Sequence, residues 1–191
     1  MSARGKRSGA AVTVILLLIL AVLIGIIAAI RLRPRVERAA YPDTYREYVE
    51  KYAAEYGLDE NLVFAVIRTE SGFRPDAESA VGARGLMQLT EETFHWINRR
   101  FDEQYDFDDL YDPETAIRFG CCTLKILYDE FGVTRTVIAA YHAGIGEVGR
   151  WLEDPAISAN GRDLDEIPID QSRHYVYKVM NAYEKYRSIY D

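Results

Sequence analysis

The sequence predicts a mainly α-helical domain that is preceded by one membrane-spanning helix. Along most of the chain, apolar and aromatic residues recur at intervals of three and four, which is the spacing of one helix face. Alternation of apolar and polar residues, the pattern of a half-buried strand, is nearly absent. Near the start, 23 uncharged residues from Ser8 to Ile30 form one apolar tract. About 20 apolar residues are enough to cross a bilayer as a helix.

The chain divides into four predicted segments. They are a short tail at 1–7, a transmembrane anchor at 8–30, a tether at 31–44 that Pro34 breaks, and a folded domain at 45–191. A cleaved signal peptide is the alternative to an anchor, but the apolar core of such a peptide is usually only about 7–15 residues long. The best cleavage site also has the bulky Ile27 at its outer small position. We therefore favour an anchor.

Two helices are expected at the start of the folded domain, over 45–56 and over 60–70. Their end signals are Asp43 or Thr44 as the first cap, Gly57 as the first C-terminal glycine, and Asp59 or Glu60 as the second cap. The next segment, 72–85, contains Pro75 and three glycines. It predicts irregular chain or a small hairpin that forms one wall of a cleft.

Helical patterns return after this wall and continue to the end of the chain. The expected elements are a helix over 90–100, a helix from Pro113 to Phe131 closed by Gly132, a helix over 137–143 capped by Thr134, a short turn over 148–152, and a last helix from about Ser172. The polar segment 155–168 should be a loop.

Glu70 is the most informative single residue. It ends the apolar run that begins at Leu62, so its carboxyl should emerge where a buried helix meets a cleft. Desolvation there favours the neutral acid, and a neutral carboxyl can donate a proton near neutral pH. The more ordinary alternative is a surface glutamate that makes a helix-end contact.

Charge and residue spacing exclude several classes of function. The first 38 residues carry a net charge of +6 and the remaining 153 residues a net charge of −13. Nucleic-acid-binding proteins neutralise phosphates with clustered Lys and Arg, so nucleic acid is not an expected partner. His95, His142 and His174 lack metal-ligand spacing, so we expect no metal and no cofactor. Adjacent Cys121 and Cys122 should be core thiols and not a disulfide.

Three blocks of the sequence resemble one enzyme family. The blocks are ESGFRPDAESAVGARGLMQL at 70–89, AYHAGIGEV at 140–148 and IPIDQSRHYVYKV at 167–179. Together they are similar to the soluble-lytic-transglycosylase (SLT) family of peptidoglycan-cleaving enzymes. Three blocks in the same order argue against a chance match. The resemblance implies that the mainly α fold is the α+β lysozyme-like one, with a single catalytic domain.

The resemblance also implies which residues form the site. Glu70 is the implied catalytic acid and base, and the expected substrate-binding residues are Ser79, Met87, Gln88, Tyr141, His142, Gln171 and Tyr175. Three positions depart from the family pattern: His142 replaces a usual Asn, Thr90-Glu91 replaces a frequent Met-Pro, and Gln171 replaces an acidic residue. The amide of Gln171 can still hydrogen-bond but carries no charge, so we expect altered substrate affinity or an altered pH profile of the enzyme and not inactivity.

The implied reaction uses one carboxyl. Glu70 protonates the glycosidic oxygen between N-acetylmuramic acid and N-acetylglucosamine, and then takes a proton from the muramoyl C6 hydroxyl, which closes on C1 as a 1,6-anhydro sugar without consuming water. Ordinary glycoside hydrolysis needs two carboxylates, and the sequence candidates for a second one are Asp76, Glu78, Asp108 and Asp109. The alternatives are a lysozyme-like muramidase and a non-catalytic peptidoglycan-binding module.

The enzyme interpretation also sets the expected location. Basic residues flank the apolar tract on both sides, so charge does not orient it. Because peptidoglycan lies outside the membrane, we expect a single-pass cell-membrane protein with an extracytoplasmic catalytic domain. The expected partners are peptidoglycan glycan strands and, through the N-terminal helix, the membrane. A cell-wall assembly, secretion or sporulation complex is a further candidate partner.

Overall fold

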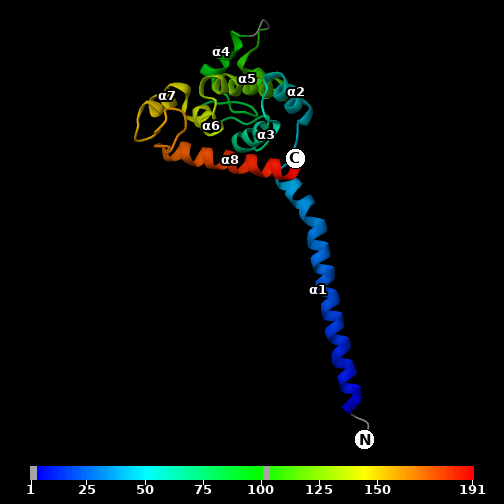
Figure 1. Cartoon of the computed structure of the whole chain (residues 1–191). Coiled ribbons are helices and arrows are strands. Elements are labelled where there is room, and N and C mark those ends of the chain that lie inside the picture. Colours follow the sequence, from blue (N-terminus) through cyan, green and yellow to red (C-terminus); the bar gives the residue numbers. More distant parts are fainter. Residues whose placement is uncertain (1–3, 101–103) are drawn as a thin grey trace. The chain divides into compact units, whose positions relative to one another are not determined.

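The computed structural model describes residues 4–100 and 104–191. The chain forms two compact units, one up to Pro42 and one from Asp43 to Asp191 (Figure 1). The described residues of the first unit form a single helix up to Ala40, and the second unit is helical throughout most of its length. Within the described residues of the second unit, the β structure consists of isolated bridges that pair Arg84 with Glu78 and with Leu89. The prediction of a mainly helical protein is confirmed.

The first unit is the helix α1 (Arg4–Ala40). Its segment Val14–Ala40 is long and apolar enough to cross a membrane, by length and composition. The tether predicted at 31–44 differs from the structure, because α1 continues through Pro34 to Ala40. A proline removes one intrahelical hydrogen bond, but the residues around it are good helix formers, and Arg33 pairs with Glu37 one turn later at 2.9 Å.

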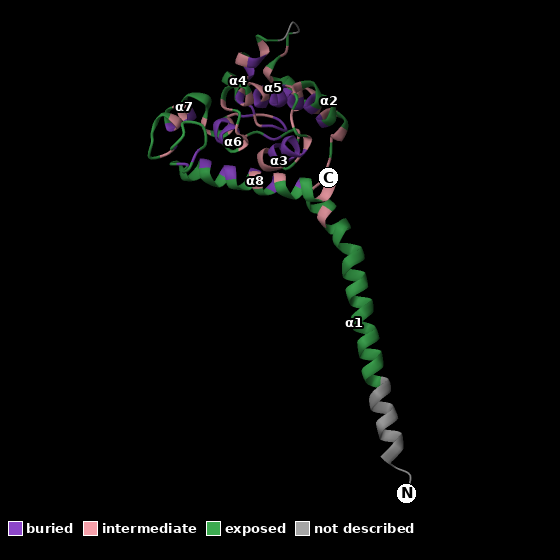
Figure 2. Ribbon diagram, viewed as in Figure 1, coloured by how far each residue is buried: buried purple, intermediate pink, exposed green. Residues whose placement is uncertain are grey.

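The second unit contains seven α-helices and one short 3₁₀ helix among its described residues. They are α2 (Arg46–Tyr56), α3 (Glu60–Glu70), α4 (Glu91–Asn98), η1 (Phe107–Tyr111), α5 (Pro113–Phe131), α6 (Thr134–Ala143), α7 (Ile145–Glu153) and α8 (Asp170–Tyr190). Figure 2 shows that the buried residues gather on α3, α5 and α6 and on one face of α8. These four helices contribute much of the core, and α4, η1 and α5 share a further hydrophobic cluster.

Helix α3 is the centre of this core. All residues from Asn61 to Ile67 are buried, so the helix has no solvent-facing side over these two turns. The Asp59 carboxylate caps its start by accepting a hydrogen bond from the Asn61 backbone N–H at 2.9 Å, as predicted. Helix α8 lies along α3, where Tyr186 stacks on Phe64 with ring centroids 5.5 Å apart. This packing fixes the direction in which α3 ends.

The chain between α3 and α4 is an irregular wall, as predicted, and two glycines let it approach the core. Gly85 has a φ of +75°, and a Cβ there would lie 1.9 Å from the Leu110 carbonyl oxygen. On α5, a Cβ at Gly120 would lie 2.0 Å from the Sδ atom of Met87. Only glycine fits at both points, so the wall rests directly on η1 and α5.

Two predicted helix caps differ from the structure. Helix α6 begins at Thr134 after an extended Val133, and the Thr134 hydroxyl accepts a hydrogen bond from Tyr128 instead of capping the helix. Helix α2 has Tyr45 at its cap position with a φ of 64°, while Asp43 pairs with Arg46 at 2.8 Å. In both cases a neighbouring side chain uses the oxygen that was expected to cap the backbone.

The Gly120 contact gives a stability prediction. Gly120→Ala should lower the Tm of the full-length chain, because overpacking costs about 1–3 kcal/mol, whereas Ala gains only about 1 kcal/mol over Gly in a helix. Gly149→Ala in α7 is the matched control, since nothing lies within 4 Å of a Cβ there. Thermal unfolding followed by circular dichroism compares them. A Tm for Gly120→Ala at or above that of Gly149→Ala would contradict the tight contact.

Candidate active site

Glu70 is the last residue of α3, at the point where the central helix meets the wall. The end of the helix is fixed by Ser71, whose buried hydroxyl lies 2.9 Å from the Leu86 carbonyl oxygen and 3.2 Å from that of Ile67. Local sequence accounts for this arrangement, because the apolar run that buries α3 stops one turn before Glu70. The carboxyl is therefore carried to the edge of the core and remains only partly exposed.

Tyr175 of α8 is the hydrogen-bond partner of this carboxyl. Its hydroxyl donates to Oε1 of Glu70 at 2.5 Å. Burial raises the pKa of Glu70 to about 7, and the bond from Tyr175 opposes part of that rise. Burial, together with the nearby charge of Glu70, raises the pKa of Tyr175 well above its ordinary value, so Tyr175 stays protonated and acts as a donor.

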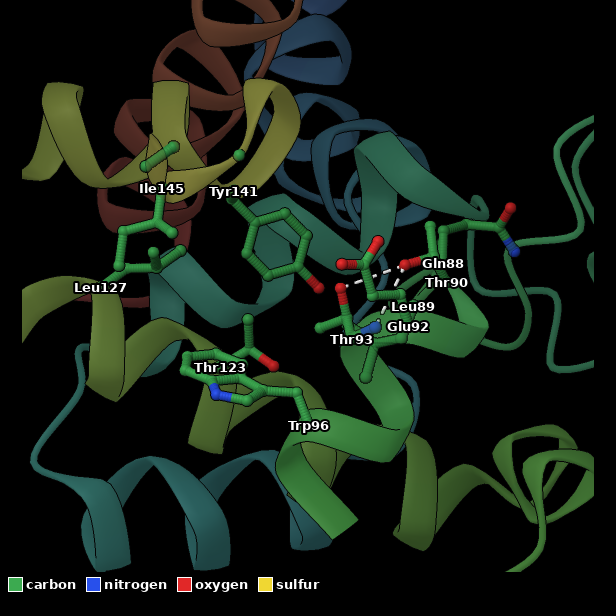
Figure 3. Close-up of a pocket in the computed structure, with 12 residues that line it drawn as sticks. Gln88, Leu89, Thr90, Glu92, Thr93, Trp96, Thr123, Leu127, Tyr141 and Ile145 are labelled. Atoms are coloured by element: carbon green, nitrogen blue, oxygen red, sulfur yellow. Dashed lines mark hydrogen bonds between the residues drawn. The ribbon is translucent and has the colours of Figure 1, made fainter. Parts of the chain in front are cut away.

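Tyr141 lines a pocket of about 390 Å³ and is near enough to Glu70 to be affected by its charge. Burial and the charge of Glu70 both raise the pKa of Tyr141, and its hydroxyl donates to the Met87 carbonyl oxygen at 2.8 Å. Figure 3 shows its ring in the pocket, with Leu127 and Ile145 on one side and Thr90 and Thr93 on the other. The pocket is lined by Gln88, Leu89, Thr90, Glu92, Thr93, Trp96, Thr123, Leu127, Ala140, Tyr141, Gly144 and Ile145.

The ring of His142 packs against the ring of Tyr175. Its ring centroid is 4.6 Å from that of Tyr175, with an angle of 30° between the ring planes. Its Nδ1 atom lies 3.1 Å from the hydroxyl oxygen of Ser172, which is buried. Burial lowers the pKa of His142. The adjacent residues Tyr141 and His142 therefore contact different parts of the site, the pocket and helix α8.

The structure separates the remaining predicted site residues. Met87 was expected to contact the glycan, but its side chain is fully buried against Gly120, so only its carbonyl reaches the site. The Gln88 amide donates to the carbonyls of Ala77 and Gly85, both at 2.9 Å, and points away from Tyr141 (Figure 3). Two buried apolar neighbours, Leu86 and Leu89, draw this segment into the core, which a local motif does not reveal.

Ser79 lies at the tip of the wall, and Gln171 lies in the first turn of α8. The Ser79 hydroxyl oxygen accepts a hydrogen bond from the Ala83 backbone N–H at 3.0 Å and so closes the tip of the wall. It is partly exposed, and Gln171 is exposed in the first turn of α8. Within the part of the chain that the structure describes, neither side chain is hydrogen-bonded to Glu70 or Tyr175. Their expected role in substrate binding stays a prediction.

The residues that the sequence offered as a second carboxylate either bond to other side chains or backbone groups or are exposed to solvent. Glu78 accepts a hydrogen bond from Tyr111 at 3.0 Å, Asp108 pairs with Arg84, and Asp109 accepts from the Asp106 backbone N–H at 2.8 Å. Asp76 is exposed. Among the residues that the structure describes, no group of three or more His, Cys, Asp or Glu side chains is placed to hold a metal ion.

The sequence reasoning missed several residues of the site. Trp96 and Thr93 of α4, Leu127 of α5 and Ile145 of α7 line the pocket. A signal existed for Trp96, because its neighbours Phe94 and Ile97 occupy the buried face of α4 and Trp96 falls outside that face. Ser172 was also missed, although a polar residue three positions before Tyr175 lies on the buried side of α8 and needs a partner.

Comparison with known proteins finds relatives that are named lytic murein transglycosylases. The soluble lytic murein transglycosylase of Escherichia coli (strain K12) is 33% identical over 150 residues, which cover 76% of this chain and 23% of the relative. The membrane-bound lytic murein transglycosylase C of Glaesserella parasuis serovar 5 (strain SH0165) is 32% identical over 168 residues, covering 76% and 46%. This chain therefore spans less than half the length of either relative.

A solved structure agrees with these relatives. It is an inactive glutamate-to-glutamine mutant of the lytic transglycosylase Slt from Pseudomonas aeruginosa, with a TM-score of 0.68 and 31% identity over 79% of this chain and 25% of that chain. The model of the transglycosylase SLT domain family matches residues 47–160, which is more than half of the 191 residues. The family resemblance is confirmed, and this chain belongs to the transglycosylase SLT domain family.

Proposed function

We propose that the protein is a lytic transglycosylase that cleaves the β-1,4 bond between N-acetylmuramic acid and N-acetylglucosamine in peptidoglycan. The observation that carries the proposal is a single carboxyl, Glu70, that is shielded at the edge of the core with a pKa of about 7. Such a group is half protonated at neutral pH, so it can act first as an acid and then as a base. The family membership supports the same activity.

In the proposed reaction Glu70 performs both proton transfers. The protonated carboxyl donates to the glycosidic oxygen, which leaves with the N-acetylglucosamine part. The resulting carboxylate then accepts the proton of the muramoyl C6 hydroxyl as that oxygen bonds to C1. Proton donation and proton uptake balance, so Glu70 returns to its starting state and no water is consumed. The C6 hydroxyl belongs to the same sugar, and such intramolecular attack has a high effective concentration.

The surrounding residues suit a sugar substrate. Tyr141 presents its ring to the pocket, and Trp96 provides a second aromatic face. Threonine hydroxyls from α4 and α5 add hydrogen-bonding groups along the pocket. We assign glycan contact to Tyr141 and Tyr175 and, more peripherally, to Ser79, Gln88, His142 and Gln171. Met87 contributes through its carbonyl, which holds the Tyr141 hydroxyl.

We further propose that α1 anchors the enzyme in the cell membrane as a single-pass segment, with the domain on the extracytoplasmic side. The length and apolar composition of Val14–Ala40 support an anchor, and one relative is itself named membrane-bound. The side is inferred from the substrate, because peptidoglycan lies outside the membrane. A cell-wall assembly, secretion or sporulation complex would reach the domain on that side.

The first test is the Glu70→Gln variant. It should lower the release of muropeptides from peptidoglycan by about 10²–10⁴-fold, because the amide cannot donate or accept the transferred proton. Mass spectrometry of the products of the parent should find anhydro ends, which are one water lighter than hydrolysed ends. Hydrolysed ends would indicate a muramidase instead. No release by either parent or variant would leave only a binding module, and equal release by both would exclude Glu70 as the proton donor.

The pH dependence of the reaction gives a second test. In the free enzyme, kcat/KM should fall as pH rises through about 7, because Glu70 loses the proton that it must donate. Tyr175→Phe removes the bond that lowers the pKa of Glu70, so this alkaline limb should move to higher pH, by roughly one pH unit. Tyr177→Phe, on the exposed face of the same helix, is the control and should leave the limb in place. A shift to lower pH with Tyr175→Phe would contradict the assignment.

The raised pKa of Glu70 also predicts a dependence of stability on pH. The folded protein holds the Glu70 proton up to about pH 7, whereas the unfolded chain releases it near 4.5, so the free energy of unfolding should fall between these values. The loss is roughly 3 kcal/mol at most. Glu70→Gln removes it, so the variant should be more stable than the parent at pH 8 and similar at pH 4.5.

Denaturant unfolding at both pH values measures this difference. The exposed Glu153→Gln variant controls for the removal of one surface charge. If the stability difference between parent and Glu70→Gln is the same at pH 4.5 and pH 8, Glu70 is not shielded as described.

A further inference from the structure

His142 makes contacts that the proposed proton transfers do not use. Its ring lies against the ring of Tyr175, with centroids 4.6 Å apart, and its Nδ1 atom is 3.1 Å from the Ser172 hydroxyl oxygen. Tyr175 in turn donates to Glu70 at 2.5 Å. One continuous set of contacts therefore runs from His142 on α6, through Tyr175 on α8, to Glu70 at the end of α3.

Both partners of His142 are fixed in place. Ser172 and Tyr175 are three residues apart on α8, so they lie on one face of that helix, and both are buried. The direction of a tyrosine hydroxyl follows from the orientation of its ring, which has only two side-chain torsions. A flat group packed on the Tyr175 ring therefore also limits where the hydroxyl points.

We propose that His142 is a positioning residue, whose ring holds the Tyr175 hydroxyl against Glu70. The inference rests on the proposed function, since it concerns the acid of that reaction. The hydrogen bond between His142 and Ser172 orients the imidazole, and the imidazole packs on the tyrosine ring. Without this support Tyr175 spends less time bonded to Glu70, and the carboxyl holds its proton more tightly.

The charged groups around His142 do not indicate an electrostatic role for this residue. Burial alone lowers the pKa of His142, so the ring is neutral near pH 7 and acts through its shape. Tyr141 and Tyr175 are the neighbouring groups that sense the charge of Glu70, and both remain protonated. Several charged side chains on the helices packed against α6 form ion pairs: Glu147 with Arg150 on α7, Asp170 with Arg173 on α8, and Lys125 with Asp129 on α5.

The test measures the protonation midpoint of Glu70 directly. Infrared spectra of the full-length chain with isotope-labelled glutamate, compared with spectra of Glu70→Gln, isolate the signal of this carboxyl during a pH titration. His142→Ala should raise the midpoint by about 0.5–1 pH unit, in the direction given by Tyr175→Phe. His142→Phe keeps a flat ring and should leave the midpoint near that of the parent. His142→Asn keeps a hydrogen-bonding amide without a ring and should resemble His142→Ala.

Two comparisons separate positioning from a general effect on the fold. In the Tyr175→Phe background, His142→Ala should cause no further change, because the bond that it supports is already absent. His174→Ala, at an exposed histidine of α8, is the matched control and should leave the midpoint unchanged. If His142→Ala does not fold by circular dichroism, the pair His142→Phe and His142→Asn decides in its place.

The inference is overturned by any of three results: an unchanged midpoint in His142→Ala, equal midpoints in the Phe and Asn variants, or a full additional shift in the Tyr175→Phe background. None of these results depends on turnover of peptidoglycan. Failure of the parent to release anhydro-muropeptides would refute the proposed function by itself, while the midpoints would still decide the role of His142.

Discussion

The hydrogen bond from Tyr175 to Glu70 is the interaction on which the proposed chemistry depends. Burial alone would raise the pKa of Glu70 further and keep the carboxyl protonated at neutral pH, which suits an acid but not a base. The tyrosine stabilises the carboxylate enough to bring its pKa to about 7. Because Tyr175 itself stays protonated, it supports both states of Glu70 without competing for the proton.

This bond requires two helices from distant parts of the chain to be held in register. Helix α3 ends at Glu70, and α8 passes along it with Tyr175 at one end of the contact and Tyr186 at the other. Tyr186 is fully buried and stacks on Phe64, so the far end of α8 is fixed by the same core that buries α3. The apolar packing of the helix pair thus sets the distance between the Tyr175 hydroxyl and the Glu70 carboxyl at its edge. This is a common way for a rigid scaffold to position a reactive group.

The wall after α3 shows why a motif residue need not be a ligand. Met87 lies within the sequence block that carries the family resemblance, yet its side chain fills the space that Gly120 leaves on α5. This contact brings the Met87 carbonyl to the Tyr141 hydroxyl, and the Gln88 amide satisfies the carbonyls of the same wall. The block therefore encodes the shape of the wall as well as the chemistry of the site. Its Gly85 permits the close approach of backbone to η1, and Gly120 on α5 leaves room for the Met87 side chain.

The sequence by itself determined the helical class, most helix boundaries and the position of Glu70 at the end of an apolar helix. These follow from local signals, namely the helical spacing of apolar residues, Asp59 as a cap, and Gly57 and Gly132 as helix ends. The tertiary structure decided which groups meet Glu70. Tyr175 lies 105 residues away in the chain, and the His142 ring and the Met87 side chain take their places only when α5, α6 and α8 pack. Local patterns report what one segment prefers, whereas contacts between distant segments depend on how the whole core is filled.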